Sequence, residues 1–296
     1  MEKVSMESAS PDSDSAEYVD WLITLANIHD EDLAEVRELL LRTPDAAVEE
    51  TLMVLRSRLG VFDPPDVIST KDELVWLEAL LRFLPEQLAW YQSRGIPEAI
   101  LRATVADIDR HVAISRTTKG RFSLDTWKWL TEHATGTLYQ LGRLQFQLIS
   151  GPAQIPGLKP EEAILGAHIP QEGPILPAAV SDSLAQAAKF FQQYFPENPV
   201  RFANCISWLL DPYLAKHLDP RSNIGQFAGR FESYDLPLDS PGDAMYFTFR
   251  IRDAQSTQNL PRETALQRLV LDRIESGGTW QVGRGYLTLP ALAGIS

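Results

Sequence analysis

The chain has 296 residues, of which 44% are apolar and 23% are charged, and its formal net charge is −13. This length and composition indicate a globular protein of about two domains, and the acidic balance disfavours nucleic acid as a partner. No apolar run approaches the roughly 20 residues of a membrane-spanning helix, so we expect no membrane association. The single cysteine, Cys205, suits a reducing compartment, so we expect a cytoplasmic protein.

The first half of the sequence is predicted to be helical. Residues 1–16 are rich in Ser, Asp and Glu, which is typical of a disordered tail, and an all-helical domain is expected over 17–136. Thr43 and Pro44 predict an N-cap and a first helical turn, because Pro suits the first position of a helix. Apolar residues follow at helical spacing, and Gly60 is expected to end that helix.

Three more helices are expected before the pattern changes. Thr70 and Glu73 have the spacing of a capping box, which predicts a helix start. Further helices are expected at about 97–115 and 124–135. This half shows no catalytic motif, and its Leu-rich faces are expected to pack within the domain. The alternatives are that it covers the acceptor side of a cleft or mediates oligomerisation.

The period of the apolar pattern changes near Gly136, so a second domain is expected over 137–296, and the proline-rich loop at 151–160 is the alternative boundary. Its first strand alternates apolar with polar residues, namely Leu144, Phe146 and Leu148 with Arg143, Gln145 and Gln147. The later expected strands are 163–170, 200–208, 223–235, 244–252 and 279–290, and the expected helices are 178–195, 211–218 and 261–276. Interleaved strands and helices predict a mixed α/β, or α+β, domain.

Several motifs of common enzyme classes are missing from the sequence. It has no GxSxG elbow, P-loop, HExxH, paired CxxC or GxGxxG, which disfavours esterases, nucleotide triphosphatases, zinc enzymes and Rossmann dehydrogenases. The five histidines show no metal-ligand spacing, and they are His29, His111, His133, His168 and His217. We therefore expect no metal.

Three long segments carry a resemblance to a known family. They are LGAHIPQEGPILPAAVSDSLAQAAKFFQQYFP, RFANCISWLLDPYLAKHLDPRSNIGQF and LPRETALQRLVLDRIESGGTWQVGRGYL. Together they resemble a bacterial family of acyltransferase-domain proteins, over roughly 138–290, with a weaker match in the helical half. The resemblance implies a helical N-acyltransferase N-terminal domain followed by a GNAT-like mixed-sheet domain.

The resemblance also implies a reaction and a way of binding its donor. Such proteins transfer an acyl group from a coenzyme A thioester to a small-molecule acceptor, usually an amine and otherwise a hydroxyl. The fold typically holds the pantetheine arm between two splayed strands and the pyrophosphate at the N-terminus of the following helix. That end of a helix offers N–H donors and a partial positive charge.

The phosphate-binding residues are hard to place from the sequence. The family's signature, Gln/Arg-x-x-Gly-x-Gly/Ala, has its nearest match at 226–231, which ends in Phe inside an expected strand, so we interpret it as a chance match. The candidate is instead the expected strand-to-helix junction 249–264, where Pro261 suits the first helical turn. The expected donors are Arg252, Arg262 and Thr264. The alternative is that Arg262 and Thr264 only begin a solvated helix.

Four residues are candidates for catalysis. His168, at the end of an expected strand, is the candidate base for the attacking amine, and the alternative is a buried histidine bonded to backbone groups. Cys205 is a candidate nucleophile whose pKa His168 would lower, although free cysteine usually packs as a small hydrophobe. Ser207 is a candidate donor to the carbonyl or the leaving thiolate, unless it binds nearby backbone. Tyr286, in the last expected strand, is the candidate general acid, because the resemblance implies that a tyrosine has this role, as in many GNAT enzymes.

Two other functions remain open at this point. The chain could be a non-catalytic GNAT-like binding or scaffolding protein, because the family's phosphate signature is missing. It could also transfer or hydrolyse acyl groups through an acyl-Cys205 intermediate.

Overall fold

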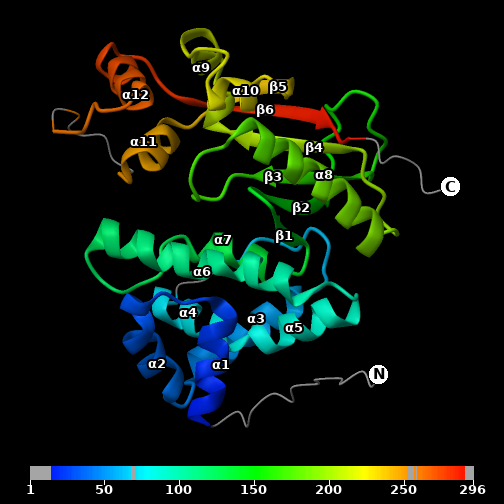
Figure 1. Cartoon of the computed structure of the whole chain (residues 1–296), viewed down its shortest axis with the longest axis vertical. Helices are drawn as coiled ribbons and strands as arrows, with labels where there is room; N and C mark the ends of the chain where they lie inside the picture. Colours follow the sequence, from blue (N-terminus) through cyan, green and yellow to red (C-terminus); the bar gives the residue numbers. More distant parts are fainter. Residues whose placement is uncertain (1–14, 68–70, 252–256, 258, 291–296) are drawn as a thin grey trace, which may run out of the picture. The chain divides into compact units, whose positions relative to one another are not determined.

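The computed structural model describes residues 15–67, 71–251, 257 and 259–290. The chain divides into two compact units, Met1–Tyr139 and Gln140–Ser296 (Figure 1). The first is helical and the second contains a sheet with helices, which confirms the predicted fold class. No helix in the described ranges is long and apolar enough to cross a membrane.

The N-terminal unit consists of helices joined by short connections. They are α1 Ala16–Ala26, the 3-10 turn η1 Asp30–Asp32, α2 Leu33–Leu41, α3 Ala46–Arg58, α4 Glu73–Arg82, α5 Leu84–Ser93, α6 Glu98–Lys119 and α7 Trp127–His133. Their core is built from apolar residues that recur at helical spacing, such as Leu77, Leu81, Leu101 and Val105. The aromatic rings of Trp76 and Trp127 stack at 4.4 Å between α4 and α7.

Two predicted helix starts in this unit need correction. The helix predicted from Thr43 begins at Ala46, because Asp45 caps it by accepting hydrogen bonds from the amides of Ala47 and Val48. The next helix begins at Glu73 with Asp72 as its cap. Asp45 and Asp72 are thus the N-caps, in place of the expected Thr43 and Thr70. Thr70 lies outside the described residues.

The C-terminal unit is built on a six-stranded sheet of order β1-β2-β3-β4-β6-β5. The strands are β1 Leu138–Leu141, β2 Leu144–Ser150, β3 Ala163–His168, β4 Phe202–Ser207, β5 Glu232–Asp239 and β6 Gln281–Thr288. The helices are α8 Pro177–Tyr194, η2 Trp208–Leu210, α9 Pro212–His217, α10 Asn223–Ala228, α11 Pro241–Phe249 and α12 Ala265–Glu275. β3 and β4 are parallel and α8 connects them, whereas β2, β6 and β5 pair antiparallel with their neighbours.

Three elements of this unit differ from the sequence prediction. The strand predicted over 223–235 begins as helix α10, which Ser222 caps by accepting from the amide of Gly225. The strand predicted over 244–252 is helix α11, whose first turn holds Pro241. Helix α12 begins at Ala265 rather than Pro261. In the first two segments the apolar runs are short enough to fit either the helical period or the strand period, and packing against the core decides between helix and strand.

Strand register gives the sheet two chemically different faces. Leu165, Ala203 and Cys205 point to one face, which we call the Cys205 face. Gly166, His168 and Asn204 point to the other, which we call the His168 face. The expected side of Cys205 along its strand, shared with Ser207, is confirmed by this register.

Candidate functional site

The parallel strands β3 and β4 part from each other near the middle of the sheet. Their pairing covers Leu165 with Ala203 and Gly166 with Asn204, and both strands continue beyond it. β3 runs on to His168 and β4 to Ser207. In open α/β sheets, ligands bind in the crevice outside the carboxyl ends of the strands. The parting of β3 and β4 is therefore the candidate site.

His168 lies at this parting on the His168 face. Its Nε2 atom is 3.2 Å from the position that a Cβ atom on Gly166 would occupy. Asn204 Oδ1 is 3.7 Å from the same point, and Ile149 Cδ1 is 3.2 Å from it. The missing side chain of Gly166 thus leaves room for the imidazole beside an amide from the neighbouring strand.

A row of polar side chains continues across the same face. Asn204 pairs with Tyr286 of β6, and Tyr286 pairs with Glu232 of β5. The Tyr286 hydroxyl donates to Glu232 Oε2 at 2.9 Å, and this bond, together with desolvation, raises the pKa of Tyr286. Asn204 Nδ2 donates to the Tyr234 hydroxyl at 3.4 Å, and burial raises the pKa of Tyr234. The row combines a base candidate with hydroxyl and amide donors.

Sequence reasoning missed Asn204 and Tyr234. Asn is uncommon inside strands, so its presence in an otherwise apolar segment was a usable signal for Asn204. Tyr234 gave no such signal, because tyrosine is common in strands.

Cys205 does not join this site. It points to the Cys205 face, opposite His168, and only 2% of its surface is exposed. Burial raises the pKa of its thiol to about 12, whereas a nucleophilic cysteine needs a lowered pKa. The prediction that His168 lowers the pKa of Cys205 is wrong. Asn204 shares the face of His168, and Cys205, the next residue of β4, points to the opposite face.

Ser207 and the predicted phosphate junction have structural partners. The Ser207 hydroxyl accepts from the amide of Leu209 at 3.1 Å and caps η2. Arg262 forms ion pairs with Asp272 at 2.6 Å and Glu275 at 2.5 Å.

Thr264 forms a capping box with Gln267 at the start of α12. The junction before α12 follows helix α11, so the expected strand-to-helix geometry was wrong. Arg252 lies outside the described residues. The donors expected at this junction thus have no support from the structure, since Arg262 and Thr264 already serve α12.

The N-terminus of α8 has the features of an anion site that the junction lacks. It is the next element after β3 in the chain, its N-cap is Leu176, and in the described part of the chain no side chain caps it. Arg230 Nη2 donates to the Pro177 carbonyl and the Ser181 hydroxyl, each at 2.9 Å. The positive charge of Arg230 at the positive end of a helix is electrostatically unfavourable. An anion bound there would interact favourably with both the guanidinium and the helix.

A cavity of about 400 Å³ lies elsewhere in the C-terminal unit. Apolar residues of η2, α9 and α10 line it, together with Gly283 and Gly285 of β6. None of the predicted catalytic residues belongs to its lining, so it is separate from the candidate site.

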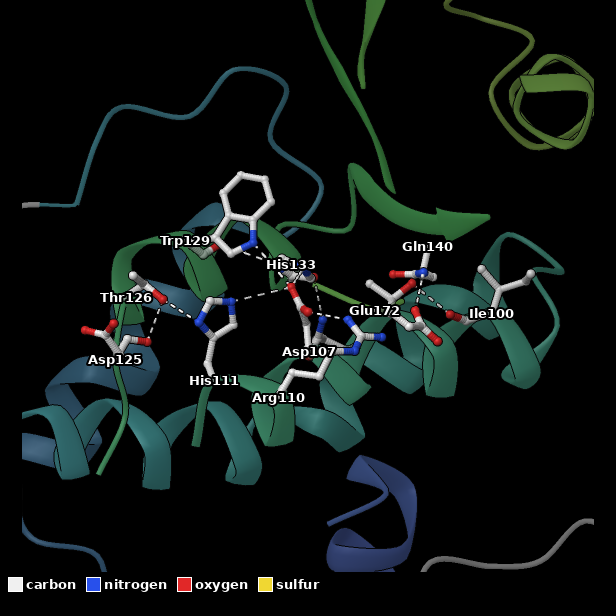
Figure 2. Close-up of polar contacts among 12 residues, drawn as sticks. Ile100, Asp107, Arg110, His111, Asp125, Thr126, Trp129, His133, Gln140 and Glu172 are labelled. Carbon is white, nitrogen blue, oxygen red and sulfur yellow. Dashed lines mark hydrogen bonds and ion pairs between the residues drawn. The ribbon is translucent and has the colours of Figure 1, made fainter. Parts of the chain in front are cut away.

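The N-terminal unit contains a buried polar cluster around Asp107 (Figure 2). His133 Nε2 lies 2.9 Å from Asp107 Oδ2, Trp129 Nε1 donates to the same oxygen at 3.3 Å, and Arg110 binds the other oxygen. Burial opposes ionisation of Asp107, but its partners outweigh burial and its pKa is lowered. Burial lowers the pKa of His111, beside the cluster, to about 4. Among the described residues, no group of His, Cys, Asp and Glu side chains could hold a metal ion.

Comparison with known families agrees with this architecture. The family described as GNAT-like C-terminal domain matches residues 138–287, and the N-acyltransferase N-terminal domain matches 18–136. The chain belongs to this acyltransferase family. The predicted resemblance and the predicted enzyme class are therefore confirmed. No curated protein matches the chain.

Solved structures of acyltransferases are similar to nearly the whole chain. One, in complex with decanoyl-CoA and teicoplanin, is 28% identical with a TM-score of 0.81, over 93% of this chain and 88% of that one. Another, in complex with CoA and 10C-teicoplanin, is 27% identical with a TM-score of 0.81, over 94% and 90%. A mutant acyltransferase in complex with octanoyl-CoA is 28% identical with a TM-score of 0.80, over 93% and 88%.

Proposed function

We propose that this acyltransferase moves an acyl group from an acyl-CoA thioester to an amine at the parting of β3 and β4. The observation that carries the proposal is the parting itself, which has His168 at its edge and leads into the uncapped start of α8. The solved relatives hold octanoyl-CoA, decanoyl-CoA and CoA, which confirms the predicted acyl-CoA co-substrate for the family.

The donor would lie along the two strands and the helix that follows. The pantetheine arm fits between β3 and β4, with the thioester beside His168. The pyrophosphate fits at the first turn of α8, where backbone amides and Arg230 supply donors. This placement replaces the predicted donors Arg252, Arg262 and Thr264 by a site at the start of α8, the next element after β3.

His168 is the proposed general base of the reaction. It accepts a proton from the acceptor amine while the nitrogen attacks the thioester carbonyl, so that a C–N bond forms. The C–S bond then breaks and the sulfur leaves as a thiolate. Tyr286, the proposed general acid, can protonate the thiolate once its hydroxyl turns away from Glu232.

The acceptor is the less defined partner. The relatives that hold teicoplanin and 10C-teicoplanin support a large, polar glycopeptide-like acceptor for this chain. We further propose that the domain boundary lies near residue 137, between the two family matches. Oligomerisation through the helical domain stays a prediction.

The alternative functions have lost their main supports. The non-catalytic alternative rested on the missing phosphate signature, and the start of α8 offers another phosphate site. The acyl-Cys205 route required a reactive thiol near His168, whereas Cys205 is buried on the opposite face.

Turnover of the wild-type chain tests the proposal. Octanoyl-CoA and decanoyl-CoA are incubated with a panel of amine acceptors that includes glycopeptides, and thiol release is followed with a thiol reagent. We expect CoA release that depends on an acceptor, and mass spectrometry should show the acylated amine. Absence of any acyl-CoA binding by calorimetry would overturn the proposal.

A further inference from the structure

We infer that Arg143 is a positioning residue that shapes the loop between β3 and α8 for the pyrophosphate of acyl-CoA. The inference rests on the proposed function, because that function places the pyrophosphate at the start of α8. Arg143 lies in the turn between β1 and β2, far from this loop in the sequence.

The side chain of Arg143 binds the loop through three different nitrogen atoms. Nη1 donates to the Pro170 carbonyl at 2.9 Å, Nη2 to the Gly173 carbonyl at 2.8 Å, and Nε to the Pro174 carbonyl at 3.2 Å. The guanidinium holds its donors in a fixed plane, so three bonds define the path of the loop.

These bonds also decide where the loop's amides point. The described peptide bonds are all trans, and the C=O and N–H groups of a trans peptide point in opposite directions. The carbonyls of Pro170 and Pro174 face Arg143, so the amides of Gln171 and Ile175 point away from it. The third carbonyl belongs to Gly173. The next residue, Pro174, has no backbone N–H, so this peptide bond has no amide donor to orient. Arg143 thus turns amide donors outward just before the first turn of α8.

The turn that carries Arg143 is itself fixed to α8. The backbone amides of Arg143 and Leu144 donate to the Ser183 hydroxyl at 2.7 Å and 3.3 Å. Gly142 has a φ of 68° and would place a Cβ 2.8 Å from that hydroxyl, so the turn approaches the helix closely. Arg143 therefore connects the loop between β3 and α8, through its side chain, with α8 itself, through its backbone amide.

A second bond supports the same loop. Gln140 Nε2 donates to Glu172 Oε2 at 3.2 Å, and to the Gly142 carbonyl at 2.9 Å (Figure 2). The bond to Glu172 connects β1 with the loop residue that lies between Pro170 and Gly173, two of the three residues whose carbonyls Arg143 binds. The loop is thus fixed from one side by two residues of β1 and its turn.

The test compares two donors in the full-length protein. Octanoyl-CoA carries the pyrophosphate, whereas octanoyl-pantetheine lacks it and ends at the pantetheine hydroxyl. We expect Arg143→Ala to raise KM for octanoyl-CoA about tenfold with kcat nearly unchanged, and to leave octanoyl-pantetheine kinetics unchanged. Arg143→Lys keeps the charge but not the three fixed donors, and should lose most of the same affinity.

Arg201→Ala is the matched control. Arg201 also binds a loop carbonyl of this unit, that of Gly157 at 3.0 Å, and pairs with Glu162 at 2.7 Å. Because its loop joins β2 to β3, both donors should keep their wild-type kinetics.

Three outcomes overturn the inference. An equal loss with both donors would indicate a general folding defect, unchanged kinetics in Arg143→Ala would show no role, and full rescue by Arg143→Lys would indicate charge rather than positioning. A wild-type chain that turns over neither donor contradicts the proposed function instead, so the two failures are distinguishable.

Discussion

His168 and Cys205 lie on opposite faces of the sheet, although the strands that carry them are neighbours. The register that separates them also places Asn204, rather than Cys205, on the face of His168. The reaction that we propose at the parting of β3 and β4 is therefore a direct transfer with His168 as the base, without an acyl-Cys205 intermediate.

Loss of the His168 imidazole should slow the chemical step without weakening donor binding. General bases contribute about 10²- to 10⁴-fold to rate, so His168→Ala should lower kcat within that range while the Kd for CoA stays near the wild-type value. His217→Ala is the control, because His217 is exposed on α9 and its ring stacks on Tyr213. Steady-state kinetics and calorimetry separate the two effects. Wild-type kcat in His168→Ala would rule out the base.

Cys205→Ala should leave turnover intact. The buried thiol fills space, so its removal should lower the free energy of unfolding by about 1 kcal/mol through lost packing. Denaturant unfolding measures the stability, and intact-mass spectrometry after incubation with octanoyl-CoA checks for an adduct. An acylated Cys205, or turnover abolished by Cys205→Ala, would restore the cysteine route.

A side chain added at Gly166 should lower activity by displacing the ring of His168. A Cβ at Gly166 would lie 3.2 Å from the imidazole Nε2, which is tight enough to displace the ring. We expect Gly166→Ala to lower kcat several-fold in the wild type and to have little further effect in His168→Ala. A double-mutant cycle measures this coupling. Independent, multiplicative losses would show that Gly166 matters for another reason.

Arg230→Ala should weaken binding of acyl-CoA. Its guanidinium lies at the positive end of α8, where the proposal places the pyrophosphate. We expect about a tenfold higher Kd for CoA, and a smaller salt dependence of binding than in the wild type. Arg221→Ala is the control, because Arg221 pairs with its neighbour Asp219 on the surface. Unchanged affinity in Arg230→Ala would remove this residue from the donor site.

The histidine beside the Asp107 cluster should make the helical unit sensitive to acid. Burial lowers the pKa of His111 from its ordinary 6.5 to about 4, so protonation favours the unfolded chain. The stability is complete above about pH 6.5 and is lost as the pH falls toward 4, by at most about 3 kcal/mol. The charged neighbours that set this value are Asp107, His133, Asp125 and Arg110.

Denaturant unfolding at several pH values, with hydrogen exchange on α6 as the probe, measures this loss. His111→Gln removes the titrating group and should flatten the stability profile between pH 6.5 and 4. A wild-type profile that is flat over this interval contradicts the buried, neutral state of His111.

Local patterns predicted most of the elements around the site. The strands predicted over 163–170 and 200–208 and the helix predicted over 178–195 are present as β3, β4 and α8. The strands predicted at α10 and α11 were wrong because short apolar runs fit both periods, and only packing chooses between them. Local sequence thus predicts an element best where its pattern is long.

The composition of the site could not be predicted in the same way. Which residues share a face with His168 depends on the register of β3 with β4, and these strands are separated by the whole of α8. The role of Arg143 depends on a turn that meets a loop about thirty residues later. Such contacts are non-local, so neither spacing nor composition reports them.

A crystal structure of the chain with decanoyl-CoA tests the central claim most directly. The account predicts the pantetheine arm between β3 and β4, the thioester carbonyl beside His168 and the pyrophosphate at the first turn of α8. A donor bound with its pyrophosphate at the start of α12, near Arg262 and Thr264, would contradict the account.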